Sequence, residues 1–412
     1  MSPLKEEALW AVTQLESIGH MTEADTAVLF HSWNQHKRYL DHLQSAFGQA
    51  HALHAVAIKT QPHPAILTQV VQWGFGLEAA SMEEVHLAIH AGCPPERIVF
   101  DSPVKTRREI KECHALYPGI RFNVNSLEEL DRLPETPSFP VGIRINPMVE
   151  TGAPSVYHVS HNESKFGVPL AEKEAILSSI DRYPVEQLHV HSGSSMANLD
   201  SAVAAIRSIL DVAAEANQRL AQSGQTRRIH SIDIGGGLMP EELTDRPSAM
   251  EGYVAALRAT CSDLWNYRII TEFGQWSYFY TGYALSQVEY AVQRGDSRVA
   301  YVHLGADFLL RDAYVKPRGI DFVPLAEAAG RPLTRTDIAG PLCFAGDYLQ
   351  KGLDMPRLEE GDNLLLLHTG SNAYALWSRH CSRTIPMVLG VDFAAAQITI
   401  LSTRNNPFLG AI

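Results

Sequence analysis

The sequence has few cysteines and lacks both basic runs and long apolar runs. The five cysteines among 412 residues are an odd number and form no C-x-x-C pair, so a disulfide framework or a zinc site is not expected. The N-terminus is acidic where a secretory signal is basic. No apolar stretch approaches the ~20 residues of a membrane helix. We therefore expect a cytoplasmic protein with reduced thiols, no metal site and no membrane partner.

The charge balance is acidic. Lys and Arg total 34 against 46 Asp and Glu, a net charge of −12. A protein that follows a nucleic-acid backbone needs the opposite balance, so no nucleic acid partner is expected. Because 45% of the residues are hydrophobic and 19% charged, a disordered chain is excluded.

Between about residues 50 and 275, short apolar runs alternate with helical patterns. The runs are apolar on both faces, as is typical of buried parallel strands. Eight such strands alternating with helices predict an α/β protein with a (β/α)8 TIM barrel. After the fourth run, Ser126 and Glu129 have the spacing of a capping box. The eight runs are Leu53–Lys59, Phe75–Ala80, Arg97–Asp101, Ile120–Val124, Val141–Asn146, Gln187–His191, His230–Ile234 and Arg268–Glu272.

The alternation of strand and helix patterns stops after residue 275, where strand-like segments follow one another with few helices. This pattern predicts a C-terminal β domain, a sandwich or barrel, over residues 276–412, behind the barrel at 36–275. Residues 1–35 are expected to pack with the β domain, with Thr26–His31 as a strand of its sheet. Residues 147–164 are expected to form a long polar loop that could cover a substrate. The expected C-terminal strands are Tyr278–Val292, Val299–Leu304, Thr334–Ala345, Asn363–His368, Thr384–Leu389 and Gln397–Ser402.

Polar residues and glycines stand at the carboxyl ends of the predicted barrel strands, where barrel enzymes place their reactive groups. Each has an ordinary alternative, such as a solvated lysine, a structural histidine or a simple turn, but together they describe one site. They are Lys59, Glu78, Arg144, the segment His189–Ser195, the glycines Gly235, Gly236 and Gly237, and Glu272.

These residue types point to one cofactor. Glycines let backbone N–H groups approach an anion, so Ser194 and Gly235–Gly237 are predicted to hold a phosphate. Lys59 can form a Schiff base with an aldehyde. Glu272 can keep a pyridine nitrogen protonated. An aldehyde, a phosphate and a pyridine together specify pyridoxal 5'-phosphate.

In the order of its motifs the sequence resembles the fold-type III pyridoxal-phosphate decarboxylases, which include the diaminopimelate, ornithine and carboxynorspermidine decarboxylases. The resemblance covers most of the chain and implies an alanine-racemase-like barrel followed by a β domain. It is carried by Val56-Ala-Ile-Lys59, Arg144-Ile-Asn-Pro, Ser164-Lys-Phe-Gly, His189-Val-His-Ser-Gly-Ser and Gly340-Pro-Leu-Cys-Phe-Ala-Gly-Asp347.

The resemblance implies roles for single residues. Lys59 would carry the cofactor and His191 would stack on its ring. Cys343 and Asp347 would enter the partner subunit's site in a homodimer, with Cys343 as the proton donor after carbon dioxide leaves. The other residues implied to bind the cofactor are Glu78, Arg144, Ser194, Gly235, Gly236, Gly237, Glu272, Gly274 and Tyr374.

Departures from the family pattern bear on the substrate. Gln275 stands where the family has an arginine, and Phe344 replaces the acid that meets the distal ammonium of diaminopimelate. We therefore expect that diaminopimelate is not the substrate. Arg311 aligns with an arginine for the distal carboxylate. With Phe344 and Asp347 it is expected to bind a non-standard amino acid or conjugate from siderophore or polyamine-type biosynthesis.

Two other functions stay open. An amino-acid racemase of the same barrel family would share Lys59 and the glycines, but such racemases place an arginine at the pyridine nitrogen. Glu272 and Cys343 favour decarboxylation. A non-catalytic, cofactor-binding regulator is the second alternative, although Lys59, Glu272, Cys343 and Asp347 are all present.

Overall fold

The computed structural model describes residues 2–15, 23–48, 50–149, 160, 163–193, 196, 199–244, 246–315, 317–325, 328 and 330–405. The chain forms two compact units. One comprises Asp41–Ser277, and the other combines Met1–Leu40 with Tyr278–Ile412. Among the described residues, no helix is both long enough and apolar enough to span a bilayer.

The unit of residues 41–277 is a closed barrel of eight parallel strands. Neighbouring strands pair in chain order, β5 also pairs with β6, and β10 returns to β2. A two-residue strand, β7 (Val168–Pro169), adds to β6 outside the barrel. The eight strands are β2 (Ala52–Ala57), β3 (Gly76–Ala79), β4 (Ile98–Phe100), β5 (Arg121–Val124), β6 (Val141–Asn146), β8 (Val185–His189), β9 (Ser231–Asp233) and β10 (Arg268–Thr271).

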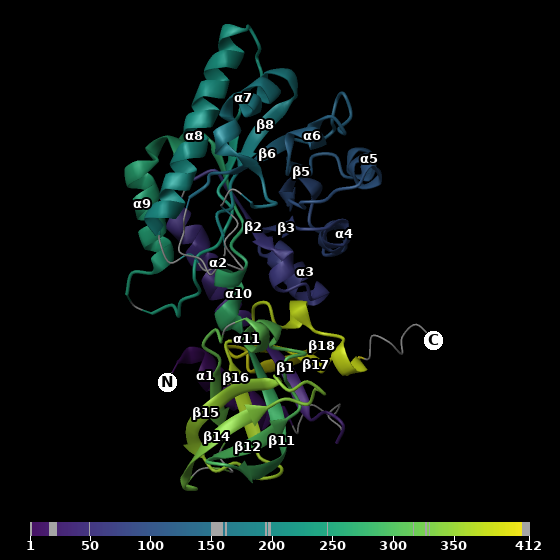
Figure 1. Ribbon diagram of the computed structural model, residues 1–412, viewed down its shortest axis with the longest axis vertical. Coiled ribbons are helices and arrows are strands. Elements are labelled where there is room, and N and C mark those ends of the chain that lie inside the picture. Colours follow the sequence, from purple (N-terminus) through teal and green to yellow (C-terminus); the bar gives the residue numbers. More distant parts are fainter. Residues whose placement is uncertain are drawn as a thin grey trace. The chain divides into compact units, whose positions relative to one another are not determined.

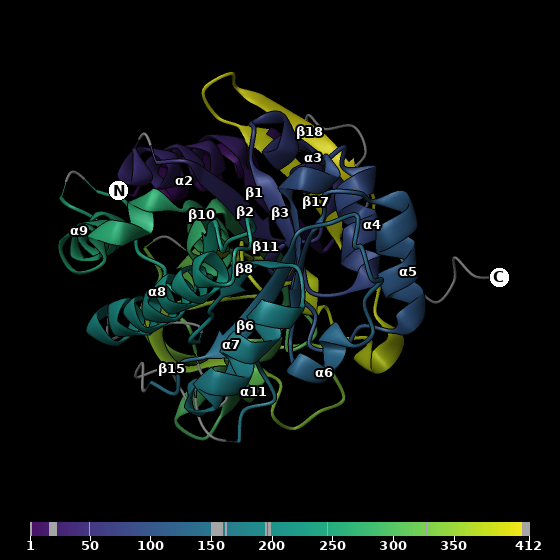
Figure 2. The same cartoon turned by 90° about the horizontal axis from the view of Figure 1, so that it is seen from above.

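Helices cover the outside of the barrel, as Figure 2 shows for α3, α4 and α5 along one side. Their starts are fixed locally: Thr106 with Glu109, and Ser248 with Glu251, form capping boxes that satisfy the first N–H groups of α5 and α9. The helices are α3 (Pro64–Gln72), α4 (Met82–His90), α5 (Arg107–Leu116), α6 (Leu127–Leu130), α7 (Lys173–Arg182), α8 (Leu199–Gln222) and α9 (Ala249–Thr260), with α2 (Trp33–Phe47) and α10 (Gln275–Tyr278) at the unit's ends.

The other unit is mostly sheet (Figure 1). Its strands run in the order β15-β14-β12-β11-β1-β17-β18, and β16 pairs with both β11 and β13. The elements are α1 (Pro3–Gln14), β1 (Ala27–Ser32), β11 (Gly282–Arg294), β12 (Ser297–Val302), α11 (Leu310–Tyr314), β13 (Asp321–Pro324), β14 (Leu333–Ala339), β15 (Tyr348–Pro356), β16 (Asn363–Leu367), β17 (Met387–Asp392) and β18 (Gln397–Ser402).

Strand β1 is buried on both faces because the sheet has a core on each side. Val28 and Phe30 belong to one core with Leu4 and Ala8 of α1. Ala27 and Leu29 alternate to the opposite core, which also contains residues of β12, β14 and β15. The N-terminal strand is therefore an interior element of the β unit, between β11 and β17.

The predicted fold class is confirmed. All eight barrel strands occur at their predicted places, and Thr26–His31 joins the C-terminal sheet as β1. Strands β13 and β15 were not predicted, and the predicted strand Thr334–Ala345 ends at Ala339 as β14. Ser126 does not cap α6 with its side chain, so the expected capping box is wrong there. Most of the 147–164 loop lies outside the described residues.

Glu7 of α1 is a carboxyl group buried in the β unit. Only 1% of the residue is exposed, and Ser32 Oγ donates a 2.6 Å hydrogen bond to Oε2. Tyr283 OH lies 3.4 Å from Oε1. Burial is the main cause that raises the pKa of Glu7 from 4.5 to about 7. The folded chain therefore binds this proton more tightly than the unfolded chain.

At a pH below the unfolded pKa, protonated Glu7 contributes up to about 3 kcal/mol to the free energy of unfolding. We expect this contribution to be lost as the pH rises through the folded pKa. Glu7→Gln should remove this part of the pH dependence and be more stable than the natural chain at pH 8. Urea unfolding at pH 4 and pH 8 measures both free energies. Equal pH slopes for the two proteins would contradict the prediction.

Candidate active site at the carboxyl ends of the barrel strands

Lys59 follows β2 in a short 3₁₀ turn, Ile58–Thr60. Its side chain is 49% exposed, but its Nζ donates to Oε2 of Glu78, which is fully buried in β3. Desolvation lowers the pKa of Lys59, yet the carboxylates of Glu78 and Glu272 outweigh it and raise the pKa overall. Lys59 is thus a half-exposed amine at the barrel mouth that a buried carboxylate holds in place.

Glu272 directly follows β10, where its backbone N–H donates to Gly235 O at 2.7 Å. Its side chain is almost fully buried, and Oε1 has no hydrogen-bond partner among the described residues. Burial, followed by the neighbouring charges of Asp233 and Glu78, raises the pKa of Glu272 well above its usual value. An unpaired buried carboxylate oxygen is costly, so it marks a place where a protonated ring nitrogen fits.

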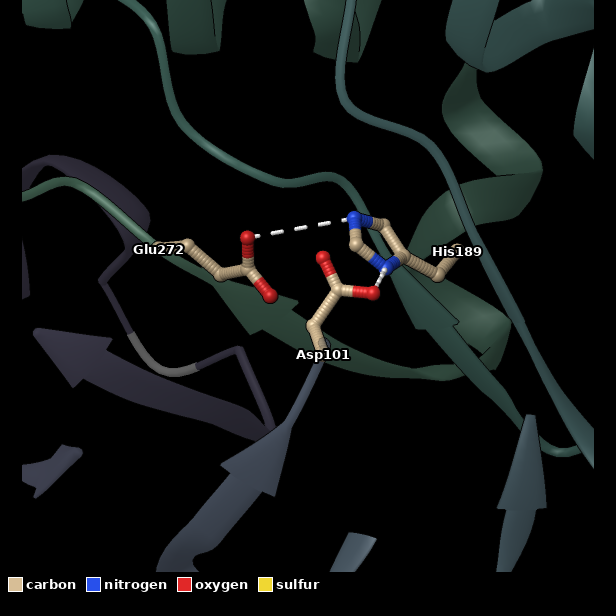
Figure 3. A group of neighbouring side chains, drawn as sticks. All are labelled: Asp101, His189 and Glu272. Atoms are coloured by element: carbon tan, nitrogen blue, oxygen red, sulfur yellow. Dashed lines mark ion pairs between the residues drawn. The ribbon is translucent and has the colours of Figure 1, made fainter. Parts of the chain in front are cut away.

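Asp101, at the end of β4, lies beside Glu272 with His189 next to both. Arg144 Nη1 donates to Asp101 Oδ2 at 2.9 Å. His189 Nδ1 is 3.4 Å from Asp101 Oδ1, and His189 Nε2 is 3.8 Å from Glu272 Oε2, so one ring nitrogen faces each carboxyl group (Figure 3). Burial raises the pKa of Asp101, but the charge of Arg144 is the largest effect in the other direction, and the pKa lies far below its usual range. Asp101 is therefore an anion.

The glycine triplet after β9 is a tight turn that excludes side chains. Gly235 and Gly237 have φ of 65° and 102°, and a Cβ on Gly236 would lie 2.4 Å from Glu272 O. Gly235 N donates to Asp233 Oδ1 at 3.0 Å, and Gly236 N donates to His191 Nδ1 at 3.2 Å. These two amides are therefore already bonded within the chain, and the predicted phosphate contact of the turn stays a prediction.

His191 is held as a neutral ring. Its Nδ1 accepts from Gly236 N, so the hydrogen of the neutral imidazole is on Nε2. Burial, and then the charges of Arg144 and Lys59, lower the pKa of His191 well below its usual value. This state suits the predicted stacking on a cofactor ring. Ser194, predicted to bind phosphate, lies outside the described residues.

The residues of the barrel mouth fit pyridoxal 5'-phosphate. The mouth offers a primary amine in Lys59, an unpaired carboxylate oxygen in Glu272 and a turn where only glycine fits. Gly274 packs directly against the turn that carries Lys59, because a Cβ at this position would lie 2.3 Å from Thr60 Oγ1. The structure thus brings together all the barrel residues predicted for the site that it describes.

The remaining predicted residues belong to the β unit. Cys343 is exposed, and its backbone N donates to Cys381 Sγ at 3.4 Å. The Phe344 ring stacks on Tyr314 of α11 with centroids 5.0 Å apart, which places the helix of Arg311 beside the Cys343 loop. Tyr374 is partly buried in the turn Tyr374–Leu376.

Asp347 is buried and holds its own loop. Its Oδ1 accepts from Ala306 N at 2.6 Å, and its Oδ2 accepts from Leu342 N at 2.7 Å. Oδ2 therefore holds the loop that carries Cys343, and Oδ1 connects this loop to Ala306. Entry of Asp347 or Cys343 into a partner's site stays a prediction.

Several polar residues of the barrel interior were not predicted as part of the site. Asp101 ends a predicted strand, as Lys59 does, so its place was a usable signal. Asn123 lies within a strand, where its polar side chain was an unusual feature of a buried run. The unpredicted residues in the polar interior are Asp101, Lys105, Arg121, Asn123, Glu129, Gln187 and Asp233.

Residues 34–278 match the family model described as pyridoxal-dependent decarboxylase, pyridoxal binding domain. The match covers more than half of the chain, so this protein belongs to that family. It is a pyridoxal 5'-phosphate-dependent decarboxylase that acts on an amino acid. Family membership selects decarboxylation over the racemase and regulator alternatives.

Curated relatives extend the similarity to almost the whole chain. The diaminopimelate decarboxylase of Zymomonas mobilis is 27% identical over 385 residues, which are 90% of this chain and 87% of the relative. That of Pseudomonas aeruginosa is 29% identical over 359 residues, 85% of this chain and 82% of the relative.

Solved structures share the fold. Diaminopimelate decarboxylase from Helicobacter pylori, complexed with L-lysine, has a TM-score of 0.82 at 22% identity and covers 96% of both chains. Arginine decarboxylase of Paramecium bursaria Chlorella virus has a TM-score of 0.80 at 18% identity, with 92% of this chain and 99% of that chain covered.

The expectation that diaminopimelate is not the substrate is contradicted by these relatives, which are 26–29% identical to this chain and named diaminopimelate decarboxylase. The expectation gave too much weight to one position. Phe344 packs against Tyr314 in the same chain, so its ring has a packing reason that is independent of the substrate. The siderophore context inferred from that exclusion has no support left.

Proposed function

We propose that the protein removes one carboxyl group from diaminopimelate. The observation that carries the proposal is the similarity over 80–92% of the chain to relatives of that name. Arg311 adds support, because its helix packs beside the Cys343 loop through the Tyr314–Phe344 stack. A guanidinium there suits a substrate with a second carboxylate, because arginine binds carboxylates with bidentate hydrogen bonds.

Each residue of the site has a separate role in the proposed reaction. Bound pyridoxal 5'-phosphate supplies a ring that accepts the electron pair left when carbon dioxide departs. Lys59 offers the amine that holds the aldehyde carbon, and Glu78 orients that amine. Glu272 would keep the ring nitrogen protonated. His191 would lie against the ring, and Cys343 would return a proton to the substrate carbon.

The substrate is tested with the purified holoenzyme and a panel of diaminopimelate, L-ornithine, L-arginine and L-lysine. We expect carbon dioxide release from diaminopimelate with L-lysine as the product. The kcat/KM for each of the other three amino acids should be at least about tenfold lower, because only diaminopimelate carries both a distal ammonium and a distal carboxylate. A higher kcat/KM for ornithine or arginine would overturn the proposal.

Arg311→Ala is expected to raise KM for diaminopimelate by about 10–100-fold with a smaller change in kcat, because a lost charged hydrogen bond weakens binding by roughly 1.5–3 kcal/mol. Steady-state kinetics give both constants. Arg318→Ala is the comparison for general damage to this region, since Arg318 pairs with Asp312 of the same helix. An unchanged KM in Arg311→Ala would contradict the role.

We also propose a homodimer in which each site combines the barrel of one subunit with Cys343 of the other. Lys59→Ala and Cys343→Ala should each be inactive alone. Mixing them under conditions of subunit exchange should restore activity toward about a quarter of the natural level, because one site of each mixed dimer is then intact. No recovery, with exchange shown by mass-labelled subunits, would contradict shared sites.

A further inference from the structure

A continuous chain of buried polar side chains crosses the barrel interior and ends at Glu272. Arg121 Nη1 donates to Gln187 Oε1 at 3.2 Å, and Gln187 Nε2 donates to Asn123 Oδ1 at 2.6 Å. Asn123 Nδ2 lies 3.0 Å from His189 Nδ1, and His189 Nε2 lies 3.8 Å from Glu272 Oε2. None of the five residues is more than 5% exposed. These five side chains connect β5, β8 and the end of β10.

The chemistry of the first member fixes the direction of every later contact. A guanidinium has donors and no acceptor, so the Gln187 atom that faces Arg121 is its oxygen. Its NH₂ group then faces Asn123, which must present its own oxygen there. The NH₂ group of Asn123 is left for His189, and Asp233 Oδ2 at 3.4 Å from the same nitrogen agrees with a donor.

The tautomer of His189 follows. Because Nδ1 accepts from Asn123, the hydrogen of the neutral ring is on Nε2, and Nε2 is the atom that faces Glu272 (Figure 3). Asp101 Oδ1 is the competing partner at 3.4 Å from Nδ1, but the contact with Asn123 is shorter. In addition, the charge of Asp101 is already paired with Arg144. Among the described residues, His189 Nε2 has no hydrogen-bond partner, although it is buried.

We propose that His189 is a positioning residue, held by Arg121, Gln187 and Asn123, whose Nε2–H supports the ionised carboxylate of Glu272 against the cofactor ring nitrogen. The 3.8 Å separation is about 1 Å longer than a typical hydrogen bond, and contacts of this kind often shorten once an active site is loaded. The proposal rests on the contact between Glu272 and the ring nitrogen, and not on the identity of the amino-acid substrate.

The surroundings of Glu272 explain why such a donor is needed. Carboxylates of Glu78, Asp101 and Asp233, from β3, β4 and β9, act on it and favour its protonated form. The cations of the region pair with other carboxylates: Lys59 with Glu78, Arg144 with Asp101 and Lys105 with Glu129. Of these, Lys59 also acts on Glu272 and favours its ionised form, but this effect is smaller than that of the three carboxylates. A protonated Glu272 could not keep the ring nitrogen protonated. Among the described contacts, His189 alone directs an N–H toward this carboxyl group.

Neutron diffraction from deuterium-exchanged crystals of the natural holoenzyme tests the tautomer without any substitution. We expect deuterium on Nε2 of His189 and none on Nδ1. Deuterium on Nδ1, alone or together with Nε2, would show that Asp101 rather than Asn123 controls the ring, and it would overturn the proposal.

The effect on the ring nitrogen is tested with ¹⁵N-labelled pyridoxal phosphate bound to the natural protein and to three variants. In His189→Phe we expect the pKa of the ring nitrogen to fall by about 1–2 units, the roughly 10–100-fold effect of a hydrogen bond to a charged group. His189→Gln keeps an N–H donor and should restore the natural titration. A natural titration in His189→Phe with the cofactor bound would overturn the proposal.

Glu272→Gln distinguishes the proposed contact between Glu272 and the ring nitrogen from the proposed role of His189. If this variant leaves the ring nitrogen unchanged, the contact between Glu272 and the ring is wrong, and the proposed role of His189 is overturned with it. If Glu272→Gln lowers the pKa of the ring nitrogen and His189→Phe does not, only the role of His189 is overturned.

Discussion

Lys59→Ala should reduce carbon dioxide release by at least about a thousandfold, because the variant lacks the amine that would bond the aldehyde carbon and exchange its proton there. The contact with Glu78 supports this expectation, since a buried carboxylate at the end of β3 holds the amine in place. Borohydride treatment followed by peptide mass spectrometry should find the cofactor covalently attached to Lys59 in the natural protein. The same treatment should find no attachment in the variant.

Lys59→Arg distinguishes the amine from its charge. Arginine keeps the ion pair with Glu78 but cannot lose its proton, so this variant should be as inactive as Lys59→Ala. Lys173→Ala is the matched control, because Lys173 forms an exposed ion pair with Glu215 outside the site and should retain full activity. An active Lys59→Arg, or attachment of the cofactor to another lysine, would contradict the assignment.

The barrel was predictable because each of its strands carries its own signal. A parallel strand that is covered on both faces is rich in apolar residues, as in Ala52–Ala57, where five of the six residues are apolar. Site residues at the ends of those runs were predictable for the same reason, because parallel strands bring their carboxyl ends to one rim.

The strands that were missed lack that signal. β13 and β15 are mostly half-exposed, so their sequences mix polar and apolar residues without a continuous run. β14 ends at Ala339 because the following loop is organised by Asp347, which binds backbone N–H groups on both of its oxygens. A side chain that accepts from residues 5 and 41 positions away leaves no local pattern.

The polar interior of the barrel could not be predicted for a related reason. Its contacts join different strands, such as Asn123 with His189, 66 positions apart. Glu129 shows how such contacts override a local pattern. Its spacing from Ser126 suggested a capping box, but its carboxylate binds Lys105 and the backbone N–H of Asn125 instead. Only the folded barrel brings these groups together.

Lys105 is the site of the largest expected loss of stability. The residue is 1% exposed, and its Nζ donates to Ser102 O at 2.6 Å and to Asn123 O at 2.8 Å. It also forms an ion pair with Glu129 Oε1 at 3.0 Å. Burial is the main cause that lowers the pKa of Lys105.

Lys105→Met should lower the free energy of unfolding by about 3–5 kcal/mol, because it keeps the length of the side chain but leaves the buried Glu129 carboxylate and two carbonyl groups unpaired. Urea unfolding of the holoenzyme measures the change. Adding Glu129→Gln removes the unpaired charge, so the double variant should lose less than the sum of the two single changes, by about 0.5–3 kcal/mol.

Lys173→Met is the matched control for burial. Lys173 and Glu215 are 2.7 Å apart, but their side chains are 41% and 37% exposed. Water already solvates both charges, so breaking this pair should change the stability by no more than about 1 kcal/mol. Both lysines thus pair with a glutamate, but only Lys105 is buried and also donates to backbone carbonyl groups. A loss in Lys105→Met as small as that in Lys173→Met would show that water reaches the barrel interior and that Glu129 needs no partner there.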